Sequence, residues 1–191
     1  LTGLRNKNVR VIGFVHDEVT RHSVLPLLAC SEIVVAAKGA GPRTPGFGRV
    51  SLVSDKSLPA KQRESYLELA KGRFSTALIR KMFEPGLVVI KVRDVGKNGE
   101  RYQAADAQLA GDPVPGLGAN AVAFYPFEQA KEYGLCQQTP LNKLDEVLLE
   151  YELSRANLVT LPERTNACHI KVDGPLSAPL KESKERAIKS A

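Results

Sequence analysis

The sequence predicts an α+β fold: a small three-stranded sheet with one helix, then a small α/β C-terminal domain, all preceded by a basic N-terminal extension. Short apolar runs separated by Gly- and Pro-containing turns fill residues 87–126 and are typical of strands. Apolar residues recur every three or four positions in residues 57–83 and 143–153, which indicates amphipathic helices. The predicted divisions are 1–84 (extension), 85–134 (sheet domain), 135–180 (C-terminal domain) and 181–191 (polar tail).

The sheet domain begins with the β-branched run Leu87–Ile90, directly behind Pro85-Gly86. Gly96 and Gly99 then lie three residues apart in a polar turn, which indicates a sharp reversal of the backbone. The remaining expected elements are a returning strand at Glu100–Ala105, one helical turn at Gln108–Gly111, a third strand at Ala121–Phe124 and a helix at Phe127–Tyr133 that ends at Gly134.

The extension is expected to contain a strand within Val9–Val15, then a helix and a strand within Ser23–Ala37. One long helix is predicted from Ser57 to Phe83, with Gly72 weakening its middle. Its apolar face comprises Leu67, Ala70, Phe74, Leu78 and Met82.

The C-terminal domain is expected to start with a helix at Lys143–Leu153, preceded by a cap within Thr139–Asn142. Leu144, Val147, Leu148 and Tyr151 share one face of this helix. Residues 168–172 alternate like a strand.

Composition indicates a globular chain of 191 residues with 43% hydrophobic and 25% charged residues. Residues 1–83 hold 14 Lys and Arg against 6 Asp and Glu, a balance of +8, whereas the other 13 and 15 leave −2. This asymmetry points to a polyanionic partner for the first half, although a simple solubility bias is the alternative. The longest apolar run, Ile33–Ala37, is much too short to span a bilayer.

Lys38–Arg49 (KGAGPRTPGFGR) combines four glycines, two prolines and three cations. The segment lacks the GK[ST] ending of a P-loop and the third glycine of a dinucleotide fingerprint. We therefore expect an extended basic loop, in which Lys38, Arg43 and Arg49 contact phosphates and Phe47 stacks on a base. A solvated linker is the alternative.

Candidate catalytic and metal-binding residues are few. His16, Asp17, Glu18 and His22 have the right side chains for a metal or acid–base site, but no second ligand cluster follows at a metal spacing, so a polar turn after a strand is the preferred interpretation. Cys168 and His169 would point to opposite faces of a strand, which argues against a nucleophile–base pair. The three cysteines form no CxxC pair and favour a reducing compartment.

Two blocks of this sequence resemble the family of large-subunit ribosomal protein nine. Val88-Val89-Ile90, Asp94-Val95-Gly96 with Gly99-Glu100, and Ala121–Pro126 match the strand, turn and final strand of the family's N-terminal domain. Leu161-Pro162-Glu163 matches an LPE segment of its C-terminal domain. The family's Arg-Asn pair, which contacts rRNA, falls on Ala110-Gly111, so the resemblance does not decide whether that contact exists here. The resemblance implies a ribosomal protein, and the N-terminal extension, the missing initial Met and the altered Arg-Asn pair favour a mitochondrial form.

We therefore expect a structural, non-enzymatic constituent of the mitochondrial large ribosomal subunit, located in the matrix, with rRNA and neighbouring ribosomal proteins as partners and no cofactor. The expected RNA-binding residues are Arg5, Lys7, Arg10, Lys38, Arg43, Arg49, Lys91, Arg93, Lys97, Asn98 and Arg101. The alternative is an enzyme or binding module that uses Lys38–Arg49 for a phosphorylated ligand, with His16, Asp17 or His22 as the base.

Overall fold

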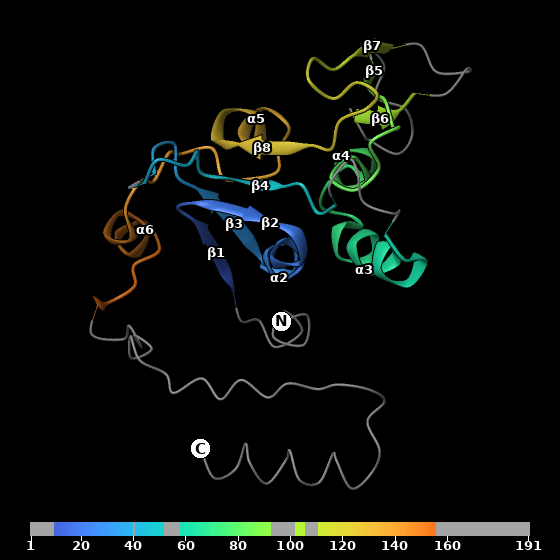
Figure 1. Cartoon of the computed structure of the whole chain (residues 1–191). Coiled ribbons are helices and arrows are strands. Elements are labelled where there is room, and N and C mark those ends of the chain that lie inside the picture. The colour runs from blue at the N-terminus through green and yellow to red at the C-terminus, as the bar shows by residue number, and fades with distance from the viewer. Residues whose placement is uncertain (1–9, 40, 52–57, 93–101, 106–110, 156–191) are drawn as a thin grey trace, which may run out of the picture. The chain divides into compact units, whose positions relative to one another are not determined.

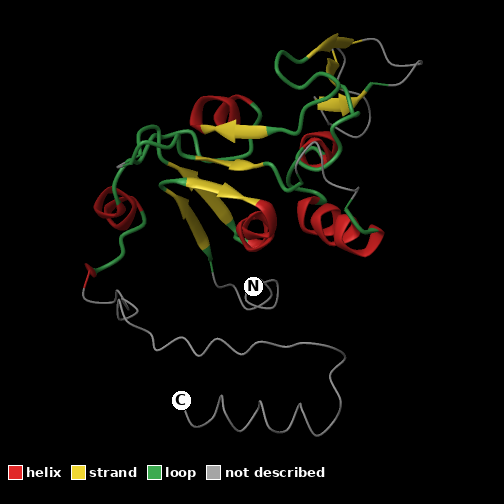
Figure 2. Ribbon diagram, viewed as in Figure 1, coloured by secondary structure: helices red, strands yellow, loops and turns green. Residues whose placement is uncertain are grey.

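The computed structural model describes residues 10–39, 41–51, 58–92, 102–105 and 111–155. Within these ranges helices and small sheets alternate along the chain, so the predicted α+β class is confirmed (Figure 1 and Figure 2). The chain divides into two compact units, Leu1–Glu152 and Leu153–Ala191. Only 153–155 of the second unit are described, so the fold below is that of the first unit.

The first described elements form a β-α-β unit. β1 (Ile12–Val15) and β3 (Glu32–Val35) pair in parallel, and α2 (Val24–Ala29) connects them after β2 (Glu18–Thr20) and the 3-10 turn η1 (Arg21–Ser23). β-branched residues suit a strand that is buried on both faces, and the end of β3 is fully buried. The strand, helix and strand expected in this part of the sequence are therefore confirmed.

A second sheet has the order β2-β4-β8, with β4 at Gly46–Gly48 and β8 at Phe124–Pro126. β2 and β4 are parallel, whereas β4 and β8 are antiparallel. The expectation that Lys38–Arg49 holds no regular element is wrong, because β4 lies inside it. Glycines at both ends of β4 lower its intrinsic strand propensity, and tertiary pairing with two neighbours overrides that preference.

The prediction of a third strand at Ala121–Phe124 is also wrong, both in the position of the strand and in the strands with which it pairs. The strand that forms is β8, and it pairs with β4 rather than with the sheet of residues 87–105. A Cβ on Gly46 would lie 2.7 Å from the Tyr125 carbonyl oxygen, so the glycine lets the β8 backbone come this close. Tyr125 and Phe47 then pack edge to face in the core with ring centroids 6.2 Å apart.

The third sheet has the order β6-β5-β7, formed by β5 (Val89–Val92), β6 (Tyr102–Ala104) and β7 (Gly111–Pro113). β6 returns antiparallel to β5, as the sequence predicts. The helical turn expected at Gln108–Gly111 is contradicted at Gly111, which opens β7. Pro113 is tolerated there because β7 is an edge strand.

The long helix expected from Ser57 to Phe83 is two helices, α3 (Ala60–Ala70) and α4 (Thr76–Lys81), which contact each other (Figure 1). The chain leaves helical geometry at Lys71, and Gly72 adopts φ +74°. Glycine takes such left-handed angles without a steric penalty, so it breaks the helix here instead of merely weakening it.

Two further helices agree with the sequence. α5 (Phe127–Glu132) follows β8 directly, and Gly134 (φ +68°) lies just beyond its end. α6 (Leu144–Glu150) lies within the predicted Lys143–Leu153 and buries Val147 and Leu148. The Glu146 carboxylate accepts backbone N–H groups of the residues that precede α6, which fixes its start.

One hydrophobic core joins residues on both sides of the boundary expected at 84 and 85. Val15, Leu28 and Phe47 belong to the same buried cluster as Tyr125 and Phe127. Residues 1–84 therefore share a core with the expected sheet domain, and the first compact unit extends to residue 152. The strand expected at 168–172, the LPE segment and the tail lie outside the described residues.

Candidate nucleic-acid interface

The basic loop that precedes β4 is tied to the body of the protein at several points. The Lys38 backbone N–H donates to the Asn142 side-chain oxygen at 2.9 Å. A Cβ on Gly39 would lie 3.1 Å from the His16 carbonyl oxygen, which brings the loop close to the carboxyl end of β1. Lys38 and Arg43 are exposed, and no hydrogen bond or ion pair between described residues engages either side chain. The described part of the chain therefore leaves both cations exposed.

Phe47 cannot stack on a base as the sequence suggested, because the structure buries it completely. The glycines beside it serve the sheet rather than an RNA backbone. A Cβ on Gly48 would lie 2.3 Å from the Ala123 carbonyl oxygen. Of the RNA contacts expected from Lys38–Arg49, only those made by its cations remain predictions.

Arg49 follows β4 immediately, and its side chain is held from two sides. Its guanidinium makes a 3.3 Å ion pair with the Glu18 carboxylate and lies over the Phe124 ring, 4.8 Å from the centroid. Half of the side-chain surface stays exposed. Its φ of +43° is unusual for a residue with a side chain.

Arg21 is a neighbour of Arg49 that the sequence analysis missed. β2 and β4 run parallel, with Thr20 opposite Gly48. The residue that follows each strand is an arginine. The Arg21 N–H donates to the Arg49 carbonyl oxygen at 3.1 Å. Arg21 is exposed and also has a positive φ, +56°. An arginine directly after a short strand was the available signal, but the pairing of β2 with β4 is not visible in the sequence.

A buried tyrosine, Tyr66, contacts the turn that contains Arg21. The Tyr66 hydroxyl lies 3.5 Å from the Arg21 carbonyl oxygen and 3.4 Å from His22 Nδ1. Burial raises the pKa of Tyr66 to about 12, so the hydroxyl keeps its proton at neutral pH. Tyr66 therefore connects α3 to the turn between β2 and α2.

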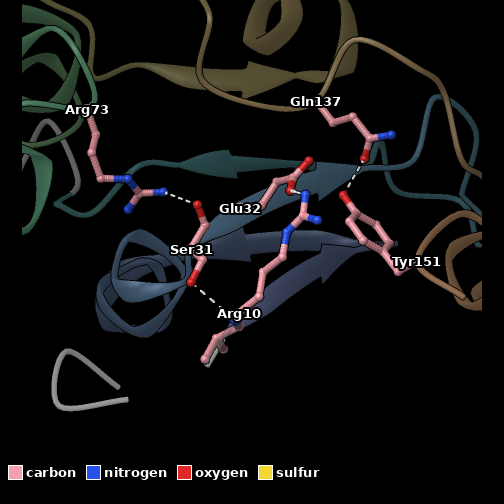
Figure 3. Close-up of polar contacts among 7 residues, drawn as sticks. Arg10, Ser31, Glu32, Arg73, Gln137 and Tyr151 are labelled. Carbon is pink, nitrogen blue, oxygen red and sulfur yellow. Dashed lines mark hydrogen bonds and ion pairs between the residues drawn. The ribbon is translucent and has the colours of Figure 1, made fainter. Parts of the chain in front are cut away.

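Arg10, another predicted RNA-binding residue, lies in a separate polar cluster (Figure 3). Its guanidinium pairs with the Glu32 carboxylate, which raises the pKa of Arg10, and it also lies 4.9 Å from the centre of the Tyr151 ring. Burial of Glu32 opposes its ionisation, but hydrogen bonds with Tyr151 and Arg10 outweigh this, so the pKa of Glu32 is lowered. The Tyr151 hydroxyl oxygen also lies 2.8 Å from the Gln137 side-chain oxygen, so its one proton serves either Glu32 or Gln137. Arg10 therefore already has an anionic partner within the chain.

Among the described residues, none of the other predicted RNA-binding residues lies on the basic loop. Lys91 is exposed on β5, in the third sheet. Six others lie outside the described residues: Arg5, Lys7, Arg93, Lys97, Asn98 and Arg101.

Several cations of α4 and its surroundings hold the fold together instead of facing a partner. Arg73 donates to the carbonyl oxygen of Leu28 at 2.8 Å. It also donates to the carbonyl oxygen of Ser31 at 2.9 Å (Figure 3). Arg80 pairs with Glu84 at 2.7 Å, and Lys81 is fully buried. The basic balance of the first half therefore overstates the positive charge that its surface presents.

His16 and Asp17 form the connection between β1 and β2, as expected for a polar turn. The His16 ring packs against Phe14, and the Asp17 carboxylate accepts the Glu18 N–H at 2.8 Å. Among the described residues, no group of three or more His, Cys, Asp or Glu has the arrangement of a metal site. Cys168 and His169 lie outside the described part.

Three of the hollows on the described surface have volumes of about 500, 500 and 350 Å³. They lie beside α5, between α3 and the end of α4, and beside Arg10 and Tyr151. No residue of Lys38–Arg49 lines any of the three, so none of them gives the basic loop an enclosed ligand site. In the part of the chain that is described, no helix has the length and apolar character needed to cross a membrane.

Comparison of the chain with protein-family models, curated proteins and solved structures found no match.

Proposed function

We propose that this chain is a structural constituent of the mitochondrial large ribosomal subunit that binds rRNA through its basic N-terminal half. The resemblance of residues 87–126 and 161–163 to large-subunit ribosomal protein nine motivates the ribosomal assignment. Neighbouring ribosomal proteins are the second class of partner, and the proposal assigns the chain no catalytic step.

The observation that carries the RNA part is a pair of exposed cations on a segment that is anchored to the body of the protein. Lys38 and Arg43 lie on a segment anchored by Asn142 and by the close approach of Gly39 to the β1 end, and Arg49 lies at its far end. Cations on a fixed backbone lose less conformational freedom when they bind than cations on an unstructured arm. Phosphate contacts of this kind supply most of the sequence-independent affinity for RNA.

The same loop is the basis of the alternative, a site for a small phosphorylated ligand. Small-ligand sites are usually concave and enclose most of the ligand. The three hollows described above are lined by other segments, whereas Lys38 and Arg43 are exposed, and exposed cations suit an extended polyanion.

Sedimentation tests the ribosomal assignment. The tagged protein from lysed mitochondria should co-migrate with the large subunit in a sucrose gradient at a salt concentration that strips loosely bound factors. A protein that stays at the top of the gradient even at low salt contradicts the proposal, and direct binding of small phosphates should then be measured.

Point substitutions test the basic loop better than truncation, because β1 to β4 belong to the core. The double variant Lys38→Gln with Arg43→Gln should weaken binding of purified rRNA about tenfold at physiological salt. It should also reduce the slope of log K against log salt by roughly 1.4, since each single-strand phosphate contact contributes about 0.7.

Lys131→Gln is the matched control, because it removes one cation from the half of the chain with a negative balance. Filter binding over a range of salt concentrations measures both quantities. If the double variant, which removes two cations, loses only about twice as much in log K as the control, which removes one, binding reflects net charge alone and not this loop.

A further inference from the structure

We propose that Arg21 and Arg49 form a clamp for a single phosphate group at the carboxyl ends of β2 and β4. The proposal deepens the RNA-binding function proposed above and rests on it for the identity of the ligand. The shared ligand chemistry is a phosphate, whether it belongs to an RNA phosphodiester or to a free phosphorylated molecule.

The position of the two residues is the first support. Adjacent strands lie about 4.8 Å apart, and Arg21 and Arg49 are the next residues after the paired Thr20 and Gly48. Their backbones are joined by the hydrogen bond from Arg21 N–H to the Arg49 carbonyl oxygen. Two guanidinium groups thus start from neighbouring points of a fixed backbone, and the carboxyl ends of parallel strands are where ligands commonly bind in α/β folds.

The backbone geometry is the second support, and it is independent of the charge. Within the described residues only four non-glycine residues have positive φ, and two of them are Arg21 and Arg49, hydrogen-bonded to each other. Left-handed geometry is unfavourable for a residue with a Cβ, so glycine would be the better choice for stability alone. Such strain is concentrated at functional sites, where the side chain is needed.

The neighbouring side chains are the third support. They orient the turn, and within the described residues they form no hydrogen bond or ion pair with the Arg21 guanidinium. Glu18 and the Phe124 ring hold the Arg49 guanidinium, and Tyr66 holds the Arg21 carbonyl oxygen from inside the protein. Arg49 is therefore the oriented member of the clamp, and Arg21 presents its donors to the phosphate.

The experiment separates stability from binding by replacing Arg21 with glycine. Arg21→Gly relieves the left-handed strain and removes no side-chain hydrogen bond or ion pair between described residues, so the Tm should stay constant or rise by about 2–4 °C. Affinity for a fluorescent single-stranded RNA oligonucleotide, measured by anisotropy, should nevertheless fall about tenfold. Arg49→Lys keeps the charge but loses the planar fork, and it should also weaken binding.

Asn120→Gly is the matched control, since Asn120 is an exposed non-glycine residue with φ +67°. It should relieve similar strain and leave RNA affinity unchanged. If Arg21→Gly and Asn120→Gly bind RNA equally well while the Lys38/Arg43 variant does not, the clamp is refuted and the RNA-binding function remains.

Inorganic phosphate distinguishes the sources of the ligand. Millimolar phosphate should compete with RNA for the wild-type protein and much less for Arg21→Gly. Phosphate binding that depends on Arg21 in a protein without affinity for RNA would support the clamp and overturn the proposed ribosomal function. Phosphate binding that is equal in the wild type and Arg21→Gly would overturn the clamp.

Discussion

At the scale of single residues, Lys81 is a buried cation that holds two segments of backbone to α4 through three carbonyl oxygens. Its Nζ donates to the carbonyl oxygens of Pro85 at 2.8 Å, Leu87 at 2.5 Å and Gly118 at 2.6 Å. The residue is fully buried, and burial lowers the pKa of Lys81. The three acceptors offset the loss of water around the ammonium group, so the cation joins α4 to the start of the third sheet.

Lys81→Met should destabilise the protein by about 2–4 kcal/mol, because three carbonyl oxygens lose a charged donor while the apolar stem is kept. Urea unfolding monitored by circular dichroism measures this change. Lys61→Met, at an exposed position of α3, should shift the free energy of unfolding by less than about 0.5 kcal/mol. Similar values for the two variants would mean that the Lys81 contacts contribute nothing net.

Tyr66 sets a limit on stability at alkaline pH. In the unfolded chain a tyrosine ionises near pH 10, whereas in the folded protein the pKa of Tyr66 is raised to about 12. The folded state therefore binds more protons between these values, and its stability falls as pH rises through this window.

Tyr66→Phe should flatten that loss by up to about 1.4 kcal/mol per pH unit above pH 10. Near neutral pH it should cost less than about 1 kcal/mol, because the hydroxyl contacts are long. Urea titrations at several pH values compare the two proteins. Parallel pH profiles would assign the alkaline loss to other tyrosines such as Tyr125, whose pKa burial also raises.

At the scale of elements, glycines decide how β4 is used. Gly48 has φ +143°, and a Cβ there would meet the Ala123 carbonyl oxygen at 2.3 Å. Gly41, in the same basic segment, has no atom within 4 Å of a Cβ position. Glycines that look alike in the sequence therefore have different roles, and only the first is required by strand pairing.

Gly48→Ala should destabilise the protein by roughly 3 kcal/mol or more, since it combines an unfavourable backbone angle with a steric clash. Gly41→Ala should be neutral or slightly stabilising, because it reduces the entropy of the unfolded chain. Thermal unfolding of both variants measures the difference. Equal Tm values would contradict the close approach of β4 and β8.

At the scale of the whole molecule, the hydrophobic core crosses the boundary that the sequence suggested. Tyr125 and Phe127, from the second half, share one buried cluster with Val15, Leu28 and Phe47 from the first. Residues 85–134 consequently lack part of their core when they are taken alone. The compact unit that contains all these residues is Leu1–Glu152.

A fragment of residues 1–152 should unfold in one cooperative transition, with a midpoint near that of the full chain. A fragment of residues 85–152 should show little ordered structure, because it lacks most of the shared core. Circular dichroism during urea titration distinguishes the two. A cooperative transition in the second fragment would restore the independent sheet domain that the sequence predicts.

The sequence by itself determined the α+β class and those elements whose signals are local. β-branched runs specify β1, β3 and β5, and Gly134 ends α5, because strand propensity and left-handed glycine act within a few residues. Tertiary structure decided that β4 forms inside the basic segment, that β8 pairs with it, and that Arg21 lies beside Arg49. Those outcomes depend on backbones from distant parts of the chain approaching closely enough to share hydrogen bonds and a core, and no local pattern encodes such an approach.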